Sequence, residues 1–152
     1  MAYGETSYQK MGIINESECL PILNQLFEDK ITFIPSTKEE NIKQKVDYWG
    51  IVNGEKRYAF DFKSSVKPWE RFCLTYKMAG TNKNVFEVGN PNITSIFFLS
   101  HERRFAFIPK KEIHSWFLEN KPKLKPGKKD DSNYFEFPTE EIIRLTTYFK
   151  NY

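Results

Sequence analysis

The fold is decided by residues 46–63, which read VDYWGIVNGEKRYAFDFK. Residues 46–52 and 56–63 are rich in aromatic and β-branched side chains, which favour strands. Asn53-Gly54 stands between the two runs, and this dipeptide in that setting is a strong hairpin signal. We therefore expect two antiparallel strands, Val46 to Val52 and Lys56 to Lys63, joined by a tight turn.

The second strand of this hairpin carries charged side chains on one face. Side chains alternate between the two faces of a strand, so Ala59, Asp61 and Lys63 share one face. Phe60 and Phe62 share the other face, which we expect to point into a core. Burying charges without partners is costly, so the charged face needs a compensating group. A divalent cation is a good candidate for that group.

The pairing register brings a second carboxylate to the same place. A loop of three residues, Asn53 to Glu55, would place Asp47 directly opposite Asp61. A two-residue loop would place Asp47 opposite Phe60, on the wrong face, unless a β-bulge restored the register. Two opposed carboxylates repel each other unless a cation bridges them, and carboxylates suit Mg²⁺. We expect the three-residue loop and a metal between the two aspartates.

The other elements follow from hydrophobic periodicity. Apolar residues at helical spacing from Cys19 to Phe27, after a capping-box pattern of Asn15 and Glu18, predict a first helix. Residues 36–45 are polar and fit either a loop or a short exposed helix. Further strands are expected at 31–34, 93–99, 104–108 and 134–137, and helices at 68–78 and 109–119. Thr139 is expected to cap a last helix whose apolar face is Ile142, Ile143, Leu145 and Phe149. This order predicts a mixed α/β domain around a central sheet.

The composition is that of one globular domain. The chain has 152 residues, 39% hydrophobic and 28% charged, with a mean hydropathy of -0.61 and no apolar run long enough to span a membrane. The N-terminus lacks the pattern of a signal peptide, and the two cysteines, Cys19 and Cys73, are too few for a disulfide framework. We expect a single domain over residues 1–152 in an intracellular compartment.

The chain is mildly basic, and five of its lysines lie in one short segment. The net charge is +3, with a pI of about 8.7, which permits a polyanionic partner without requiring one. Residues 121–129 read KPKLKPGKK, and the prolines and glycine there favour an exposed loop. Such a loop fits either a solvated surface or a phosphate contact. Its lysines are Lys121, Lys123, Lys125, Lys128 and Lys129.

The hairpin pattern resembles the PD-(D/E)XK nuclease superfamily, which has the restriction-endonuclease-like fold. The residues that carry the resemblance are Val46-Asp47 and, fourteen residues after Asp47, Asp61-Phe62-Lys63. Val46 stands where the motif name has proline, a position that varies in the family. The resemblance is to small phage-type or resolvase-like members and covers an αβββαβ core of about residues 10–108. Residues 109–152 match nothing in the family and are expected to form a C-terminal β/α extension.

The resemblance implies a Mg²⁺- or Mn²⁺-dependent endonuclease that hydrolyses DNA phosphodiester bonds. Asp47, Asp61 and the Phe62 carbonyl would bind the metal, together with Glu16 or Glu18 of the first helix. We favour Glu16, because Glu18 then serves as the capping partner of Asn15. Lys63 would orient or deprotonate the attacking water, or stabilise the transition state. Further phosphate contacts are expected from Ser64, Ser65, Lys67 and Lys77, and from the five lysines of residues 121–129.

Two other readings remain open. A non-catalytic nucleic-acid-binding module on the same fold would use the basic loop and the many aromatic side chains. A partner-binding domain that retains only the fold would present the alternating Asp and Lys as a solvated sheet face.

The expected partner is DNA, with a homodimer possible and no membrane. The expected location is the cytoplasm of a bacterial or phage-infected cell. The sequence leaves open the substrate structure and the choice of DNA or RNA.

Overall fold

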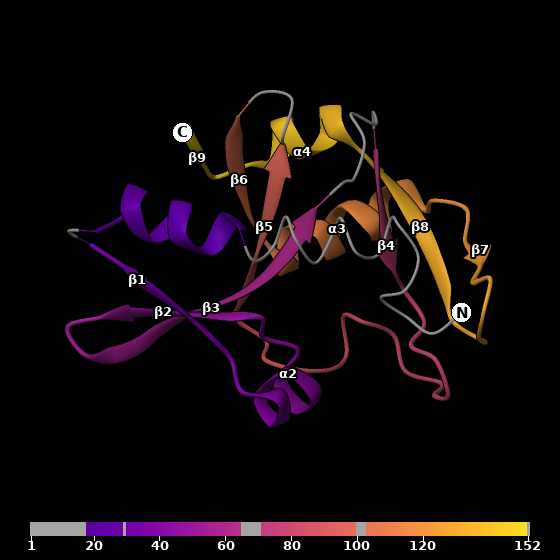
Figure 1. The fold of residues 1–152 in the computed structure, drawn as a ribbon. Coiled ribbons are helices and arrows are strands. Elements are labelled where there is room, and N and C mark those ends of the chain that lie inside the picture. The colour runs from indigo at the N-terminus through magenta and orange to yellow at the C-terminus, as the bar shows by residue number, and fades with distance from the viewer. Residues whose placement is uncertain (1–17, 29, 65–70, 100–102, 152) are drawn as a thin grey trace.

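The protein has an α/β architecture with two sheets (Figure 1). The computed structural model describes residues 18–28, 30–64, 71–99 and 103–151. The larger sheet has the order β1-β2-β3-β5-β6-β9, and the smaller sheet has the order β4-β8-β7. The pair β3 and β5 is parallel, whereas the other neighbours in both sheets are antiparallel. The expected mixed central sheet is therefore confirmed.

The elements have the following bounds. The larger sheet is built from β1 (Thr32–Pro35), β2 (Tyr48–Val52), β3 (Glu55–Ser64), β5 (Ile93–Leu99), β6 (Arg104–Pro109) and β9 (Tyr148–Asn151). The smaller sheet is built from β4 (Arg71–Thr75), β7 (Lys125–Pro126) and β8 (Asn133–Pro138). The helices are residues 18–26, α2 (Lys38–Gln44), α3 (Lys110–Asn120) and α4 (Thr139–Leu145). In Figure 1 the β2–β3 turn and the smaller sheet lie at opposite ends of the molecule.

The β2–β3 hairpin reaches the expected register by a different route. Asn53 and Gly54 have φ angles of 52° and 78°, and Val52 pairs with Glu55, so the loop has two residues rather than three. A register shift between Gly50 and Ile51 adds one residue to the β3 side. Tyr48 therefore pairs with Phe60, and the backbone N–H of the preceding Asp47 donates to the Phe60 carbonyl at 2.8 Å. The bulge thus returns Asp47 to a position opposite Asp61.

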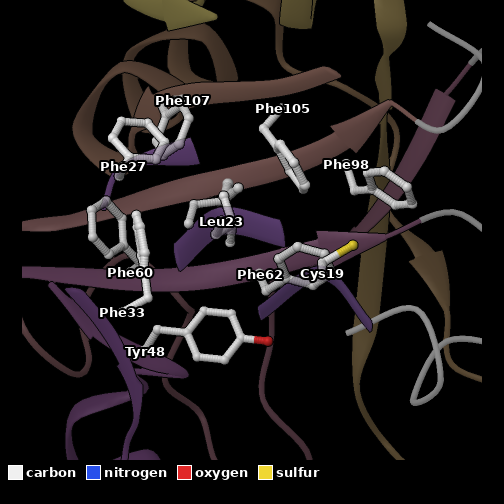
Figure 2. Packing of buried hydrophobic residues seen from close by; sticks show 11 residues of the cluster. Cys19, Leu23, Phe27, Phe33, Tyr48, Phe60, Phe62, Phe98, Phe105 and Phe107 are labelled. Carbon is white, nitrogen blue, oxygen red and sulfur yellow. The ribbon is translucent and has the colours of Figure 1, made fainter. Parts of the chain in front are cut away.

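The two faces of the larger sheet are covered by different elements. Cys19 and Leu23 of the first helix, and Phe27 directly after it, pack on the face that carries Phe60 and Phe62 (Figure 2). Because side chains alternate along β3, Asp61 and Lys63 project from the opposite face. On that face a second core joins the sheet to α3, α4 and the smaller sheet through residues that include Phe97, Ala106, Ile113, Phe135 and Ile142. The predicted distribution of side chains over the two faces of β3 is confirmed.

The helix predicted at 68–78 is wrong where the structure describes it. Residues 71–75 form β4, which pairs with β8. Phe72 and Leu74 are buried, whereas Cys73 and Thr75, which follow them in turn, are exposed, and this is the two-residue alternation of a strand. The spacing of Phe72 and Tyr76, which also fits a helix, misled the prediction. The helix of the expected αβββαβ order is thus replaced over these residues by a strand of a second sheet.

Smaller differences concern the segment before β2 and the C-terminal end of the chain. The segment 36–45 contains α2, which begins with a capping box formed by Thr37 and Glu40. Thr139 is the first residue of α4 rather than its cap, which is Pro138. Phe149 belongs to β9, an unpredicted strand that pairs with β6, and Ile143 is 40% exposed rather than part of a buried face. None of the helices in the described ranges has the length and apolar character that a membrane crossing requires.

Candidate active site

Asp47 is fixed where β2 begins beside β3. Its Oδ2 accepts a hydrogen bond from the Phe62 backbone N–H at 2.7 Å, while its own N–H donates to the Phe60 carbonyl. The N–H and C=O of one strand residue leave on the same edge, so the Phe62 carbonyl also lies on the edge that faces Asp47. Asp47 and β3 therefore meet at a point where a carboxylate and a backbone carbonyl are available together.

Asn41 of α2 holds the other oxygen of Asp47. Its Nδ2 donates to Asp47 Oδ1 at 2.8 Å and to the Val46 carbonyl at 3.1 Å. The Val46 carbonyl also accepts a hydrogen bond from Ser36 Oγ, just before α2. Sequence reasoning missed Asn41. The signal that could have found it is the Thr37 capping box, which places Asn41 one turn into a short helix directly before Asp47.

Asp61 and Lys63 form an ion pair on the same face of β3. Lys63 Nζ lies 3.2 Å from Asp61 Oδ2, and the two side chains are 33% and 15% exposed. The second carboxylate oxygen, Asp61 Oδ1, is buried and has no hydrogen-bond partner among the described residues. Burying such an oxygen without a partner is unfavourable, and most buried polar atoms in proteins have one. Asp61 Oδ1 is thus suited to a cation or a water that the protein itself does not supply.

Burial and neighbouring charges shift the pKa values of Asp47 and Lys63. Burial raises the pKa of Asp47, the Phe62 N–H opposes that shift, and the negative charge of Asp61 adds to it. The charge of Asp61 raises the pKa of Lys63 against the effect of burial, and Asp47 contributes in the same direction. Lys63 is therefore a protonated cation at neutral pH, and it lies near Asp47, whose ionisation is disfavoured by burial and by the charge of Asp61.

Lys110, the first residue of α3, belongs to the same electrostatic environment. Burial lowers its pKa, Asp61 counteracts this, and the positive charges of Lys63 and Lys45 add to the lowering. Lys45 follows α2 with a left-handed backbone, φ 60°, and its own N–H donates to the Asn41 carbonyl. Sequence reasoning missed Lys110 as well. It stands in Pro109-Lys110-Lys111 at a predicted helix start, but nothing local indicates that this helix start lies within the electrostatic reach of Asp61.

Several of the other predicted site residues cannot be placed. Glu16, Ser65 and Lys67 lie outside the described residues, and Ser64 is placed only as the last residue of β3. Glu18 is exposed at the start of the described part of the first helix. Among the described residues, no group of three or more His, Cys, Asp or Glu side chains could hold a metal ion. The acidic part of the described site is therefore the pair Asp47 and Asp61.

The predicted phosphate-contacting lysines lie in different surroundings. Lys77 was expected on a helix but pairs in a β-bridge with Asn84, and its Nζ contacts Asp131 Oδ2 at 3.0 Å. Lys125 lies in β7 and pairs with Glu136 at 2.7 Å. The exposed lysines of the basic loop are Lys121, Lys123, Lys128 and Lys129. Exposure of most of this loop is confirmed. Lys77 and Lys125, in contrast, form ion pairs with Asp131 and Glu136.

Comparison with known proteins gives little direct information. No protein-family model matches the chain, and no curated protein matches it. Among solved structures, it is similar to D212, a nuclease from a fusellovirus, with a TM-score of 0.44 and 16% sequence identity. The match covers 88% of this chain and 84% of that one. The case for a function therefore rests on the chemistry of Asp47, Asp61 and Lys63.

Proposed function

We propose that the protein is a Mg²⁺-dependent endonuclease that hydrolyses phosphodiester bonds in DNA. One observation carries the proposal: Asp61 Oδ1 is buried and lacks a hydrogen-bond partner within the described residues, in a cluster that contains Asp47 and Lys63. A structural ion pair would satisfy both carboxylate oxygens, because an unpaired buried oxygen costs stability. An oxygen kept without a partner is the arrangement expected where a ligand completes the site.

The donor set fits a hard divalent cation. Asp47, Asp61 and the Phe62 carbonyl offer oxygen ligands only, which Mg²⁺ prefers over nitrogen or sulfur. Glu16, which lies outside the described residues, is the acidic residue that we propose for the remaining protein ligand. When bound, Mg²⁺ would lower the pKa of a water molecule and neutralise charge on the scissile phosphate. Asn41 and the Phe62 N–H would orient Asp47 as a ligand, because they fix both of its oxygens.

Lys63 would serve as a hydrogen-bond donor rather than as a base. The charge of Asp61 raises the pKa of Lys63, so the ammonium keeps its proton at neutral pH. An ammonium held beside two carboxylates can orient the attacking water and stabilise negative charge that develops on the phosphate. This assignment excludes deprotonation of the water, which is one of the three roles that the motif alone leaves open for this lysine.

The basic loop would contribute to binding rather than to chemistry. Lys121, Lys123, Lys128 and Lys129 are exposed and can each neutralise a phosphate with release of counterions. Replacing these four lysines with glutamine should weaken DNA binding and flatten its dependence on salt, while the chemical step on bound DNA changes little. An unchanged salt slope would return this loop to the role of a solvated surface.

The proposed function is tested by nicking of supercoiled plasmid in Mg²⁺ and in EDTA. The wild type should nick in Mg²⁺ only. Lys63→Met, which keeps the aliphatic stem and removes the charge, should lower the rate about a hundredfold or more while DNA binding in EDTA is nearly unchanged. Lys43→Met is the matched control, because Lys43 is an exposed lysine of α2 paired only with Glu39 in the described contacts. It should cleave like the wild type.

Two results would contradict the proposal. Equal nicking in Mg²⁺ and in EDTA would exclude a metal-dependent reaction, and full activity of Lys63→Met would exclude the role given to that lysine. A folded wild type that binds DNA without cutting it would favour the second candidate, a non-catalytic nucleic-acid-binding module. The four exposed lysines of the basic loop are the observation that supports this alternative.

A further inference from the structure

A small hollow lies next to the candidate active site. It has a volume of about 150 Å³ and is lined by residues 86–91 on one side and by Lys110, Lys111 and His114 of α3 on the other. The rings of Phe86 and His114 stack with centroids 4.4 Å apart. The stacked rings therefore join the two sides of the hollow, and the α3 side also carries two lysines.

The loop that forms one wall is held against α2, close to Asp47. The Asn90 N–H donates to the Gln44 carbonyl at 2.9 Å. At Gly89, where φ is 79°, a Cβ would lie 2.6 Å from the same carbonyl and 2.9 Å from Lys45 Cγ. Only glycine allows such a close approach with this backbone. The hollow is thus tied to the segment of α2 that also carries Asn41.

Lys110 connects the hollow to Asp61. Its Nζ contacts the Val88 carbonyl at 3.4 Å, so it leans toward the 86–91 loop. Its charge also interacts with Asp61, Lys63 and Lys45. The lining of the hollow carries Lys110 and Lys111 against the carboxylate of Glu87, and the positive end of the α3 dipole lies at Lys110. Glu87 is the acidic residue in the lining, and it accepts a hydrogen bond from Asn84 Nδ2.

The size of the hollow decides which part of a nucleic acid it could hold. Pockets that enclose drug-sized ligands occupy about 300–1,000 Å³. A hollow of about 150 Å³ is too small for a nucleoside but large enough for a phosphate group. A phosphate group would also complement the positive charge of Lys110, which is partly buried at the edge of the hollow.

We propose that Lys110 and this hollow bind a backbone phosphate of the nucleic acid that runs past Asp47 and Asp61. The inference rests on the proposed function for its substrate class, since it takes nucleic acid as the ligand. It goes beyond that function by assigning a phosphate-binding subsite to α3, in the part of the chain that the nuclease resemblance does not cover. Lys110 is given a binding role, whereas Lys63 is given the catalytic one.

The test uses a fluorescein-labelled DNA duplex and the full-length protein, first in EDTA so that binding is measured without cleavage. Lys110→Met should weaken binding about tenfold, as expected for one charge-assisted hydrogen bond. It should also reduce the slope of log affinity against log salt concentration by about one. Lys43→Met should change neither quantity. Lys110→Arg keeps the charge and should retain most of the affinity.

A second measurement locates the contact. In a set of duplexes that each carry one uncharged methylphosphonate, one position should weaken binding of the wild type and leave binding of Lys110→Met unchanged, because both changes remove the same interaction. In Mg²⁺, Lys110→Met should raise KM more than it lowers kcat. A kcat loss as large as that of Lys63→Met with an unchanged KM would overturn the binding role.

The outcomes separate this inference from the proposed function. Weaker binding by Lys110→Met but not by Lys43→Met supports the subsite even if the wild type cuts nothing, in which case only the nuclease proposal fails. Equal affinity of Lys110→Met and wild type overturns the subsite even if plasmid is nicked. Equal loss of affinity in Lys110→Met and Lys110→Arg, with both folded by circular dichroism, also overturns it, because the role would then be structural.

Discussion

Replacement of Asn41 by alanine is a sharp test of how the site is supported. The change removes an Nδ2 group that donates to Asp47 Oδ1 at 2.8 Å and to the Val46 carbonyl at 3.1 Å. A hydrogen bond to a charged group contributes about 1.5–3 kcal/mol to stability, and a neutral one about 0.5–1.5 kcal/mol. Asn41 is exposed, so water replaces part of both bonds and the lower ends of these ranges apply, which together give about 2 kcal/mol. Alanine is also the better helix former by up to about 0.7 kcal/mol, which leaves a net loss of about 1 kcal/mol.

The effect of Asn41→Ala on cleavage should exceed its effect on stability. Asp47 keeps the Phe62 N–H on Oδ2 but loses the group that fixes Oδ1. Groups that orient a metal ligand typically change metal affinity or activity by about 10–100-fold, so we expect a loss of nicking in that range. The loss should be partly recovered at high Mg²⁺, because the defect lies in ligand orientation. This recovery separates a positioning role from general destabilisation.

The assay pairs urea unfolding with plasmid nicking, and Ile42→Ala is the matched control. Ile42 is the next residue of α2 and is 57% exposed, so its replacement gains the same kind of helix propensity without losing these hydrogen bonds. Asn41→Ala should unfold at lower urea than this control and should nick more slowly. If the two variants agree in both measurements, Asn41 does not support Asp47 and the description of the site is wrong.

Three further predictions concern the metal, the bulge and pH. Mg²⁺ at a hundred times its Kd should stabilise the wild type by about 2.7 kcal/mol, which raises Tm by about 5 °C or more, and Asp61→Asn should abolish this shift in a thermal melt. Gly50→Ala should lower the free energy of unfolding in urea by about 1–3 kcal/mol, because the new Cβ would lie 2.8 Å from Cε2 of the buried Phe60 ring. An unchanged free energy of unfolding would mean that the bulge adapts to the extra methyl group. The raised pKa of Asp47 means that the folded state binds its proton more tightly than the unfolded state does. Its stabilising contribution is therefore full below the ordinary value of 3.8 and is lost as the pH rises through the raised pKa. In EDTA, the wild type should therefore lose stability relative to Asp47→Asn as the pH rises from about 4. If the difference in unfolding free energy between the two proteins stayed constant from about pH 4 to pH 7, the raised pKa would be contradicted.

The hairpin could be predicted because its signals are local. Asn53-Gly54 specifies the turn, and strict alternation assigns Asp61 and Lys63 to the face opposite Phe60. The predicted pairing register of Asp47 and Asp61 is correct although the predicted loop of three residues is wrong. The bulge next to Gly50 adds the residue that the shorter loop removes. A glycine inside a strand is a signal for such a bulge, and here its lack of a Cβ also admits the Phe60 ring.

The segment after the hairpin could not be predicted, because its structure depends on distant partners. Residues 71–75 pair with β8, more than fifty residues further along the chain. Over five residues the apolar pattern fits helix and strand about equally well, and the pairing partner then decides between them. The same reason hides Lys110, since its approach to Asp61 depends on how α3 packs beside the larger sheet and not on any local pattern.

Burial is what distinguishes the candidate site from an ordinary sheet surface. Alternating Asp and Lys on a strand fits a solvated face as well as it fits a nuclease motif, so the sequence pattern alone cannot separate the two. A solvated face would leave Asp61 in water, whereas here its side chain is 15% exposed and Oδ1 is buried without a partner in the described residues. Burial also opposes ionisation of Asp47, which lies within the electrostatic reach of Asp61. Such an arrangement lowers stability unless a cation completes it, and proteins retain costs of this kind mainly at functional sites. The unpaired oxygen is therefore stronger support for a metal-binding site than the motif that first drew attention to it.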